Sequence, residues 1–140
     1  MSVRQRIVMD TSTLIGALLR PGSVPRQAFL AAVGTCEHCV SHATLNELTE
    51  VLQRPKFDRY APLRERLGFL ALLTERSLLW DVDAVSEQSA AGACRDTKDD
   101  KFLALALACQ AVALVSSDDD LLVLNPWQGV PILTPAQFLK

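Results

Sequence analysis

The sequence predicts an α/β protein, a three-layer α/β/α sandwich whose central sheet is mostly parallel. Strand-like runs alternate with helical patterns through most of the chain, which is typical of parallel sheets joined by crossover helices. Several of the runs are continuously apolar, as expected for strands covered on both faces. In such sheets ligands bind beyond the carboxyl ends of the strands, near the point where strand order reverses.

Length and composition favour one globular domain, residues 1–140. The chain is 49% hydrophobic and 21% charged, with a formal net charge of −2. No apolar run reaches the roughly 18 residues of a membrane span, and Asp10 interrupts the apolar start where a signal peptide would continue. We therefore expect a cytoplasmic protein without a membrane association.

The first strand is expected in "RIVMD", which ends on Asp10. The following "TSTLIGALL" has helical spacing, with Thr11 or Ser12 available as the N-cap. A second helix, "PRQAFLAAV", begins with Pro25 in its first turn and ends at Gly34.

The middle of the chain reads as a short strand, "CEHCVS", and two helices. In "HATLNELTEVLQ" one apolar stripe is formed by Leu45, Leu48, Val51 and Leu52. Glu47 lies off this stripe. In "APLRERLGFLALLTERS" the residues expected to face the core are Leu63, Leu67, Leu70 and Leu73.

The last part of the chain contains the runs "LLWDV", "AVALV" and "VPILT", which we predict as strands, and a closing helical turn, "PAQFLK". A short helix is expected in "SEQSAAGACR". The four cysteines do not suggest a disulfide framework in a chain of this class. The motif "CEHC" has C-x-x-C spacing, but no second pair of ligands follows it, so we favour a strand over a zinc site.

Acidic residues crowd the start of a helix that appears fully buried, in "RDTKDDKFLALALA". Capping alone explains part of the cluster, with Thr97 as N-cap and Asp100 completing a capping box. Likewise, the three aspartates that follow "ALVSS" are compatible with a helix start. Either cluster by itself is compatible with a structural role.

The expected positions of three aspartates in the sheet change this interpretation. Asp10, Asp99 and Asp118 are all expected to reach one edge of the sheet, where their carboxylates would repel one another unless protonated or bridged by a cation. Oxygen ligands favour Mg²⁺ or Mn²⁺. The chemistry that follows is metal-assisted hydrolysis of a phosphate ester. The segment around Arg54 and Lys56 is basic and could hold a polyanion, although a solvated helix face explains it equally well.

Four motifs together resemble a known family: "IVMDTSTLIGALLRPGSVPRQAF", "VSHATLNELTEVLQRPKF", "CRDTKDDKFLALALA" and "ALVSSDDDLL" followed by "PILTPAQFL". They are similar to the PIN domain of VapC-like ribonucleases, the toxins of bacterial type II toxin-antitoxin modules. The similarity covers nearly the whole chain. It implies a Rossmann-like fold and a Mg²⁺- or Mn²⁺-dependent endoribonuclease holding one or two ions, with an RNA substrate, a small antitoxin partner and a homodimeric state.

The same resemblance implies roles for individual residues. It matches four principal acids to Asp10, Glu47, Asp99 and Asp118. Further ligands for an ion or its waters are implied at Asp96 and Asp120, and supporting roles at Thr11, Ser12 and Ser116. Candidate contacts with the RNA backbone are Arg20, Arg54 and Lys56. Either Glu47 or Asp120 would accept the proton of the attacking water.

Two departures from the family pattern are modest. Ser12 replaces an asparagine often found there, and Gln110 stands where relatives usually have glycine before a strand. Two other functions stay open. A haloacid dehalogenase-like phosphatase would use Asp10 as nucleophile, but Ser12 occupies the position of its second aspartate. A non-catalytic antitoxin- or RNA-binding module would keep the acids only as helix caps.

Overall fold

The computed structural model describes residues 4–140; residues 1–3 of the predicted domain lie outside the described range. Five parallel strands form one sheet in the order β3-β2-β1-β4-β5. The strands are β1 (Arg6–Met9), β2 (Glu37–Val40), β3 (Leu78–Leu79), β4 (Ala113–Val115) and β5 (Ile132–Leu133). The α/β fold and parallel sheet predicted from the sequence are therefore confirmed.

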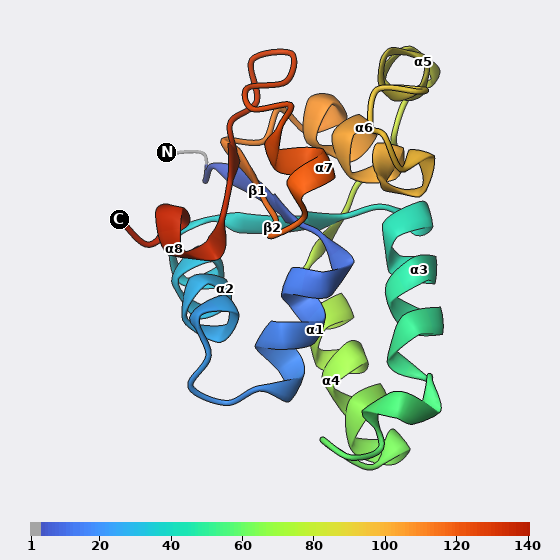
Figure 1. Ribbon diagram of the computed structural model, residues 1–140, viewed down its shortest axis with the longest axis vertical. Coiled ribbons are helices and arrows are strands. Elements are labelled where there is room, and N and C mark those ends of the chain that lie inside the picture. The colour runs from blue at the N-terminus through green and yellow to red at the C-terminus, as the bar shows by residue number, and fades with distance from the viewer. Residues whose placement is uncertain (1–3) are drawn as a thin grey trace.

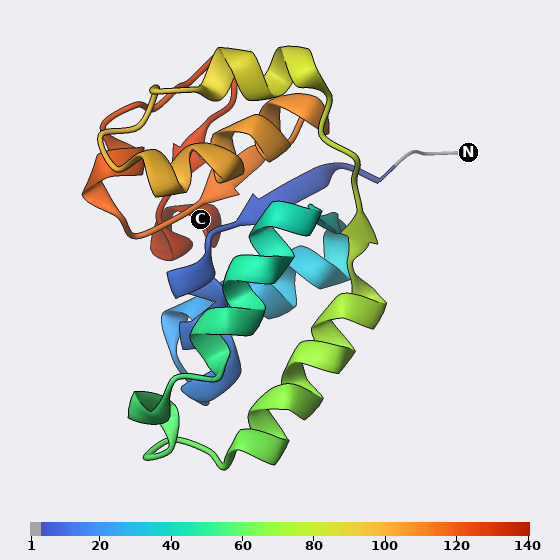
Figure 2. The same cartoon turned by 90° about the vertical axis from the view of Figure 1, so that its right-hand side faces the viewer.

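Helices cover both faces of this sheet, which makes three layers (Figure 1). The helices are α1 (Thr11–Leu19), α2 (Val24–Thr35), α3 (His42–Leu52), α4 (Leu63–Arg76), α5 (Ala84–Ala90), α6 (Asp100–Ala108), α7 (Asp119–Leu122) and α8 (Pro135–Phe138), with short 3₁₀ helices η1 (Pro55–Phe57) and η2 (Thr97–Asp99). Figures 1 and 2 show α1 to α4 on one side of the strands and α5 to α7 on the other.

The chain runs outward through β1, β2 and β3, then returns across the sheet to place β4 on the other side of β1. Strand order therefore reverses between β1 and β4, whose paired residues include Val8 with Leu114 and Met9 with Val115. The carboxyl ends of these two central strands mark the place where a parallel sheet most often binds a ligand.

Alternation along β1 divides the core in two. Val8 points into a cluster built around α6, while Ile7 and Met9 point into a second cluster built from α1 to α4. The described part of the chain, residues 4–140, contains no helix long and apolar enough to span a membrane. All four cysteines are buried and free.

The prediction for α4 is partly wrong. Leu73 is buried, but Leu63 and Leu67 are 43% and 40% exposed, and the other buried residue of this helix is Arg66, two turns before Leu73. The Arg66 guanidinium donates to the backbone carbonyls of Leu52, Arg54 and Ala61 and forms an ion pair with Asp58. An arginine on the buried face is stable here because it satisfies carbonyls at the end of α3.

Candidate active site

Asp10 and Ser116 begin the candidate site, because each directly follows one of the two central strands. The backbone N–H of Asp10 donates to the Val115 carbonyl at 3.1 Å, which continues the β1–β4 ladder to the sheet edge. The Ser116 hydroxyl donates a short hydrogen bond to the second carboxylate oxygen of Asp10, and it accepts the Asp118 N–H at 2.9 Å. One buried serine thus couples the positions of two of the predicted acids.

Asp10 is also the N-cap of α1, a role that the sequence analysis assigned to Thr11 or Ser12. Its Oδ1 accepts the Thr13 N–H at 3.0 Å, and the Ser12 hydroxyl lies 3.4 Å away. Only 4% of Asp10 is exposed. Burial raises its pKa, and the negative charge of Asp118 adds to this, although the hydrogen bonds from Ser116 and Thr13 partly offset the rise.

Asp99 and Asp118 form an acidic pair beside Asp10. Burial raises the pKa of Asp99 to about 7; a hydrogen bond shared with the Asp118 carboxyl and the charges of Asp118, Asp96 and Asp10 act in the same direction. Such a pair holds one proton between two carboxyl groups at neutral pH. A divalent cation would relieve the same repulsion.

In the acidic cluster at the start of α6, Asp96 and Asp100 bind backbone N–H groups, whereas the Asp99 side chain does not. The Asp96 side chain caps η2 by accepting the Lys98 N–H. The Asp100 carboxylate accepts the N–H groups of Gly92 and Cys94 at 2.8 and 2.9 Å, so it ties down the preceding loop. The predicted capping box between Thr97 and Asp100 is therefore wrong. Asp99 makes no capping hydrogen bond with its side chain, although it occupies the N-cap position of α6.

Glu47 reaches the same place from α3. Its Oε2 accepts a short hydrogen bond from the Thr11 hydroxyl, and its Oε1 lies 2.7 Å from Lys101 Nζ. Lys101 also donates to the Lys98 carbonyl. These contacts hold the Glu47 carboxylate toward the sheet edge and pair it with the Lys101 ammonium group.

One cavity of about 810 Å³ brings these groups together; we call it the acidic cavity. Predicted site residues that line it are Asp10, Thr11, Ser12, Glu47, Arg54, Lys56, Asp96, Asp99 and Asp118. Three predicted residues do not line it. Ser116 is fully buried and reaches the site through its hydrogen bonds with Asp10 and Asp118. Asp120 contributes no lining atoms, and Arg20 lies in a neighbouring pocket, where its guanidinium is 5.6 Å from the centre of the Tyr60 ring.

Sequence reasoning missed Lys98 and Lys101, which both line the acidic cavity. A weak signal was present, because both lysines interrupt the aspartates of "DTKDDK" at a spacing of three residues, which places them on one side of a helix start. Helix capping explains acids in this motif but assigns no role to the two lysines.

The donor chemistry of the acidic cavity suits a hard divalent ion. Its candidate ligands are all carboxylates, and the nearest cation, Lys101, is already paired with Glu47. Within residues 4–140, however, no three His, Cys, Asp or Glu side chains are gathered tightly enough to hold a metal as they stand. Binding would thus require the carboxylates to close around the ion.

Comparisons with known proteins concern the fold and the family of the chain. A family model described as "PIN domain" matches residues 6–120. A search of curated protein sequences finds no match. A chain of the Rickettsia felis VapBC2 complex, solved bound to a promoter DNA fragment, superimposes with a TM-score of 0.67 at 12% identity, covering 91% of this chain and 96% of that one.

Two further structures share the fold. VapC20 of Mycobacterium tuberculosis, a toxin that cleaves the sarcin–ricin loop, gives a TM-score of 0.58 at 18% identity and covers 89% of this chain and 98% of its own. FitAcB from Neisseria gonorrhoeae gives 0.59 at 21% identity, with 93% and 98% covered. The family match spans most of the chain and both central strands of the site; the protein belongs to the PIN domain family and has the fold of VapC-like toxins.

Proposed function

We propose that this protein is a Mg²⁺- or Mn²⁺-dependent endoribonuclease and the toxin of a toxin-antitoxin pair. The observation that carries the proposal is the buried Asp10 carboxylate, which shares one cavity at the sheet edge with the Asp99–Asp118 pair and Glu47. Hydrogen bonds from backbone N–H groups account for Asp96 and Asp100, but Asp99 has no structural partner other than another acid.

Asp10, Asp99 and Asp118 are the residues we propose to hold the ion. Their mutual repulsion supports this assignment, because the same charges that raise the pKa of Asp99 would bind a doubly charged cation. Asp96 lines the cavity and is a candidate for a second ion or its waters, whereas Asp120 lies outside the lining. A Mg²⁺ or Mn²⁺ ion bound there would acidify a water molecule and neutralise charge on phosphate oxygens.

The protein's own groups would then orient the reaction. Ser116 fixes the relative positions of Asp10 and Asp118 through its two hydrogen bonds. Thr11 and Lys101 fix both oxygens of Glu47. Glu47 is the better candidate for accepting the proton of the attacking water, because it lines the cavity and Asp120 does not.

Basic side chains around the acidic cavity support a nucleic acid substrate. Arg54, Lys56 and Lys98 are exposed and line it, so they could contact phosphates on either side of the cleaved bond. Arg54 also lies 3.7 Å from Glu50, an exposed ion pair that phosphate could replace at little cost. Arg20 lies outside this cavity, so a contact with RNA there would require the strand to extend past Tyr60.

The structural neighbours include the VapBC2 and FitAB complexes, in which a PIN-fold chain is found with a partner protein. On that basis we propose a small antitoxin partner for this chain, together with a homodimeric state and a cytoplasmic location. Co-purification with the product of an adjacent gene would test the partner directly.

RNA cleavage with Mn²⁺ present or absent tests the proposed function. We expect defined cuts in a structured RNA, with 5′-phosphate and 3′-hydroxyl ends, that disappear in EDTA and return when Mn²⁺ is added. Asp10→Asn should abolish cleavage, whereas Asp119→Asn, at an exposed acid outside the acidic cavity, should not. Cleavage that persists without divalent metal, or in Asp10→Asn, would refute the proposal.

A further inference from the structure

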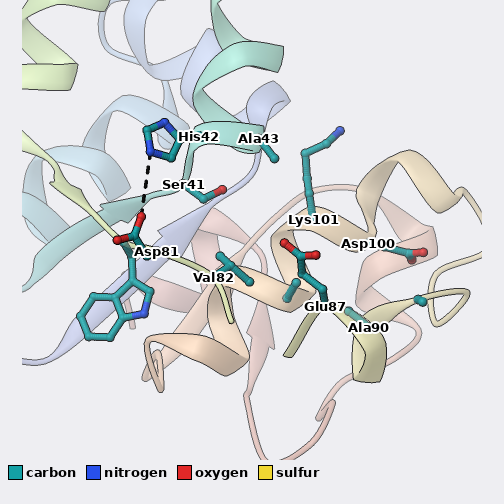
Figure 3. A pocket seen from close by; sticks show the side chains of 12 residues that line it. Ser41, His42, Ala43, Asp81, Val82, Glu87, Ala90, Asp100 and Lys101 are labelled. Atoms are coloured by element: carbon teal, nitrogen blue, oxygen red, sulfur yellow. Dashed lines mark ion pairs between the residues drawn. The ribbon is translucent and has the colours of Figure 1, made fainter. Parts of the chain in front are cut away.

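A second cavity, of about 530 Å³, lies beside the acidic cavity and has no role in the function proposed above; we call it the base cavity (Figure 3). It is bounded by the start of α3, by the segment between β3 and α5, and by α5 and α6. At its mouth the His42 imidazole lies 3.9 Å from the Asp81 carboxylate, and both side chains are largely exposed. A volume of this size is typical of sites for small ligands.

The two cavities adjoin each other. Ala43 and Lys101 line both of them, and Lys101 Nζ contacts the Glu47 carboxylate, which belongs to the acidic cavity. A ligand with one group near the Asp10 carboxylate could therefore place an adjoining group in the base cavity. An RNA strand has this form, since each phosphate carries a nucleoside on either side.

The walls of the base cavity suit a flat ring. Three alanines, Ala90, Ala91 and Ala104, line it from α5 and α6, so the side chains there are short. Trp80 also lines the cavity, and the guanidinium of Arg6 lies 4.5 Å from the centre of its ring. Aromatic and small apolar surfaces are what unstacked bases contact in RNA-binding proteins.

One carboxylate in this cavity is free to bind a ligand. Asp81 faces His42, and the Asp100 carboxylate is occupied by two backbone N–H groups. Glu87 makes no side-chain hydrogen bond or ion pair with any residue in the range 4–140, and Figure 3 shows its carboxylate directed from α5 into the space between Val82 and Lys101. A carboxylate only accepts hydrogen bonds, and its two oxygens can accept from two adjacent donors. Guanine presents such a pair, N1–H and N2–H₂, on its Watson–Crick edge, whereas cytosine, adenine and uracil each present a single donor group there.

We propose that the base cavity binds the nucleobase next to the cleaved phosphate, and that Glu87 selects guanine over the other three bases. The position of this base beside a cleaved phosphate rests on the nuclease function proposed above. Binding of the base itself does not, because it requires neither a metal ion nor turnover.

Nucleoside titrations of the ¹⁵N-labelled protein in EDTA test base binding without cleavage. Guanosine should shift the amide signals of Glu87 and Ala91 and the Trp80 indole signal, and adenosine, cytidine and uridine should shift them less at the same concentration. Glu87→Gln should remove the preference, because an amide both donates and accepts, whereas Glu75→Gln, on an exposed part of α4, should retain it. Ala91→Phe, at an exposed lining position, should block all nucleosides. Absence of shifts with guanosine up to its solubility limit, or equal shifts with the other three nucleosides, would overturn the proposal.

Cleavage of matched oligoribonucleotides provides the second test. When the base beside the cut is changed from guanine to adenine, the cleavage rate of the wild type should fall by about 5- to 100-fold, as expected for loss of a specific base contact. The rate of Glu87→Gln should change much less. Nucleoside binding without any RNA cleavage would support the base cavity and refute the nuclease. Cleavage with no dependence on base identity at any position would refute the base cavity alone.

Discussion

Replacing Asp99 by asparagine should change how the stability of the metal-free protein depends on pH. The native state raises the pKa of Asp99 from 3.8 to about 7, mainly through burial and the neighbouring Asp118. The folded protein therefore holds this proton more tightly than the unfolded chain does. The stabilisation is complete below pH 3.8 and is lost as pH rises through about 7.

The size of this effect follows from the shift. If fully realised, it would correspond to about 4 kcal/mol, since each tenfold change in proton affinity contributes about 1.4 kcal/mol. Asp99 is partly exposed, and solvent screening reduces this to about 1–2 kcal/mol. Asparagine is neutral at every pH, so Asp99→Asn should be more stable than the wild type by that amount at pH 8 and should lose the advantage below pH 4.

Urea unfolding in EDTA between pH 4 and pH 8 measures this difference directly. Asp119→Asn, at a neighbouring exposed acid, should follow the wild-type profile. Saturating Mn²⁺ should reverse the order at pH 8, because the wild type gains binding energy, about 2.7 kcal/mol at a hundredfold excess over Kd, that the variant largely lacks. A difference between wild type and Asp99→Asn that does not vary with pH would refute the account of the acidic pair.

Three other predictions concern the scaffold. Burial lowers the pKa of His38 from 6.5 to about 4, so the unfolded chain binds the proton more tightly than the folded protein does. The free energy of unfolding should therefore fall by about 3 kcal/mol as pH drops from 6.5 to 4. In urea unfolding, the stability of His38→Gln should depend less on pH over this range. Arg66→Met should cost about 3–5 kcal/mol in urea unfolding, because buried carbonyls lose a charged donor; a loss below 1 kcal/mol would contradict the role given to this residue. Gln110 has a φ of 55°, which favours glycine. Gln110→Gly should therefore increase the free energy of unfolding by up to about 1 kcal/mol and raise the melting temperature; a lower melting temperature would show that this backbone is not strained.

The sequence was most informative where local pattern and topology coincide. Asp10 and Ser116 each follow an apolar run, and parallel strands necessarily bring such positions to one edge. Glu47 could not be assigned in this way. Its helix face relative to the sheet edge depends on tertiary packing, so only the family resemblance singled it out.

Errors arose where a polar side chain takes part in tertiary structure. In α4 the residues that face the core include Arg66, Leu70 and Leu73. Because Arg66 is charged, this stripe looks polar in the sequence, and the stripe that contains Leu63 and Leu67 looks more apolar. Asp100 likewise resembles a capping-box residue in sequence, yet it binds backbone N–H groups eight and six residues earlier. Neither contact has a signature in local spacing.

Diffraction from a crystal grown with Mn²⁺, recorded to locate the anomalous signal of the ion, tests the central claim most directly. The account predicts a peak in direct contact with the carboxylates of Asp10, Asp99 and Asp118, and its loss in Asp10→Asn. A peak elsewhere on the molecule, or an acidic cavity that stays free of manganese while the carboxylates keep their separate contacts, would contradict it.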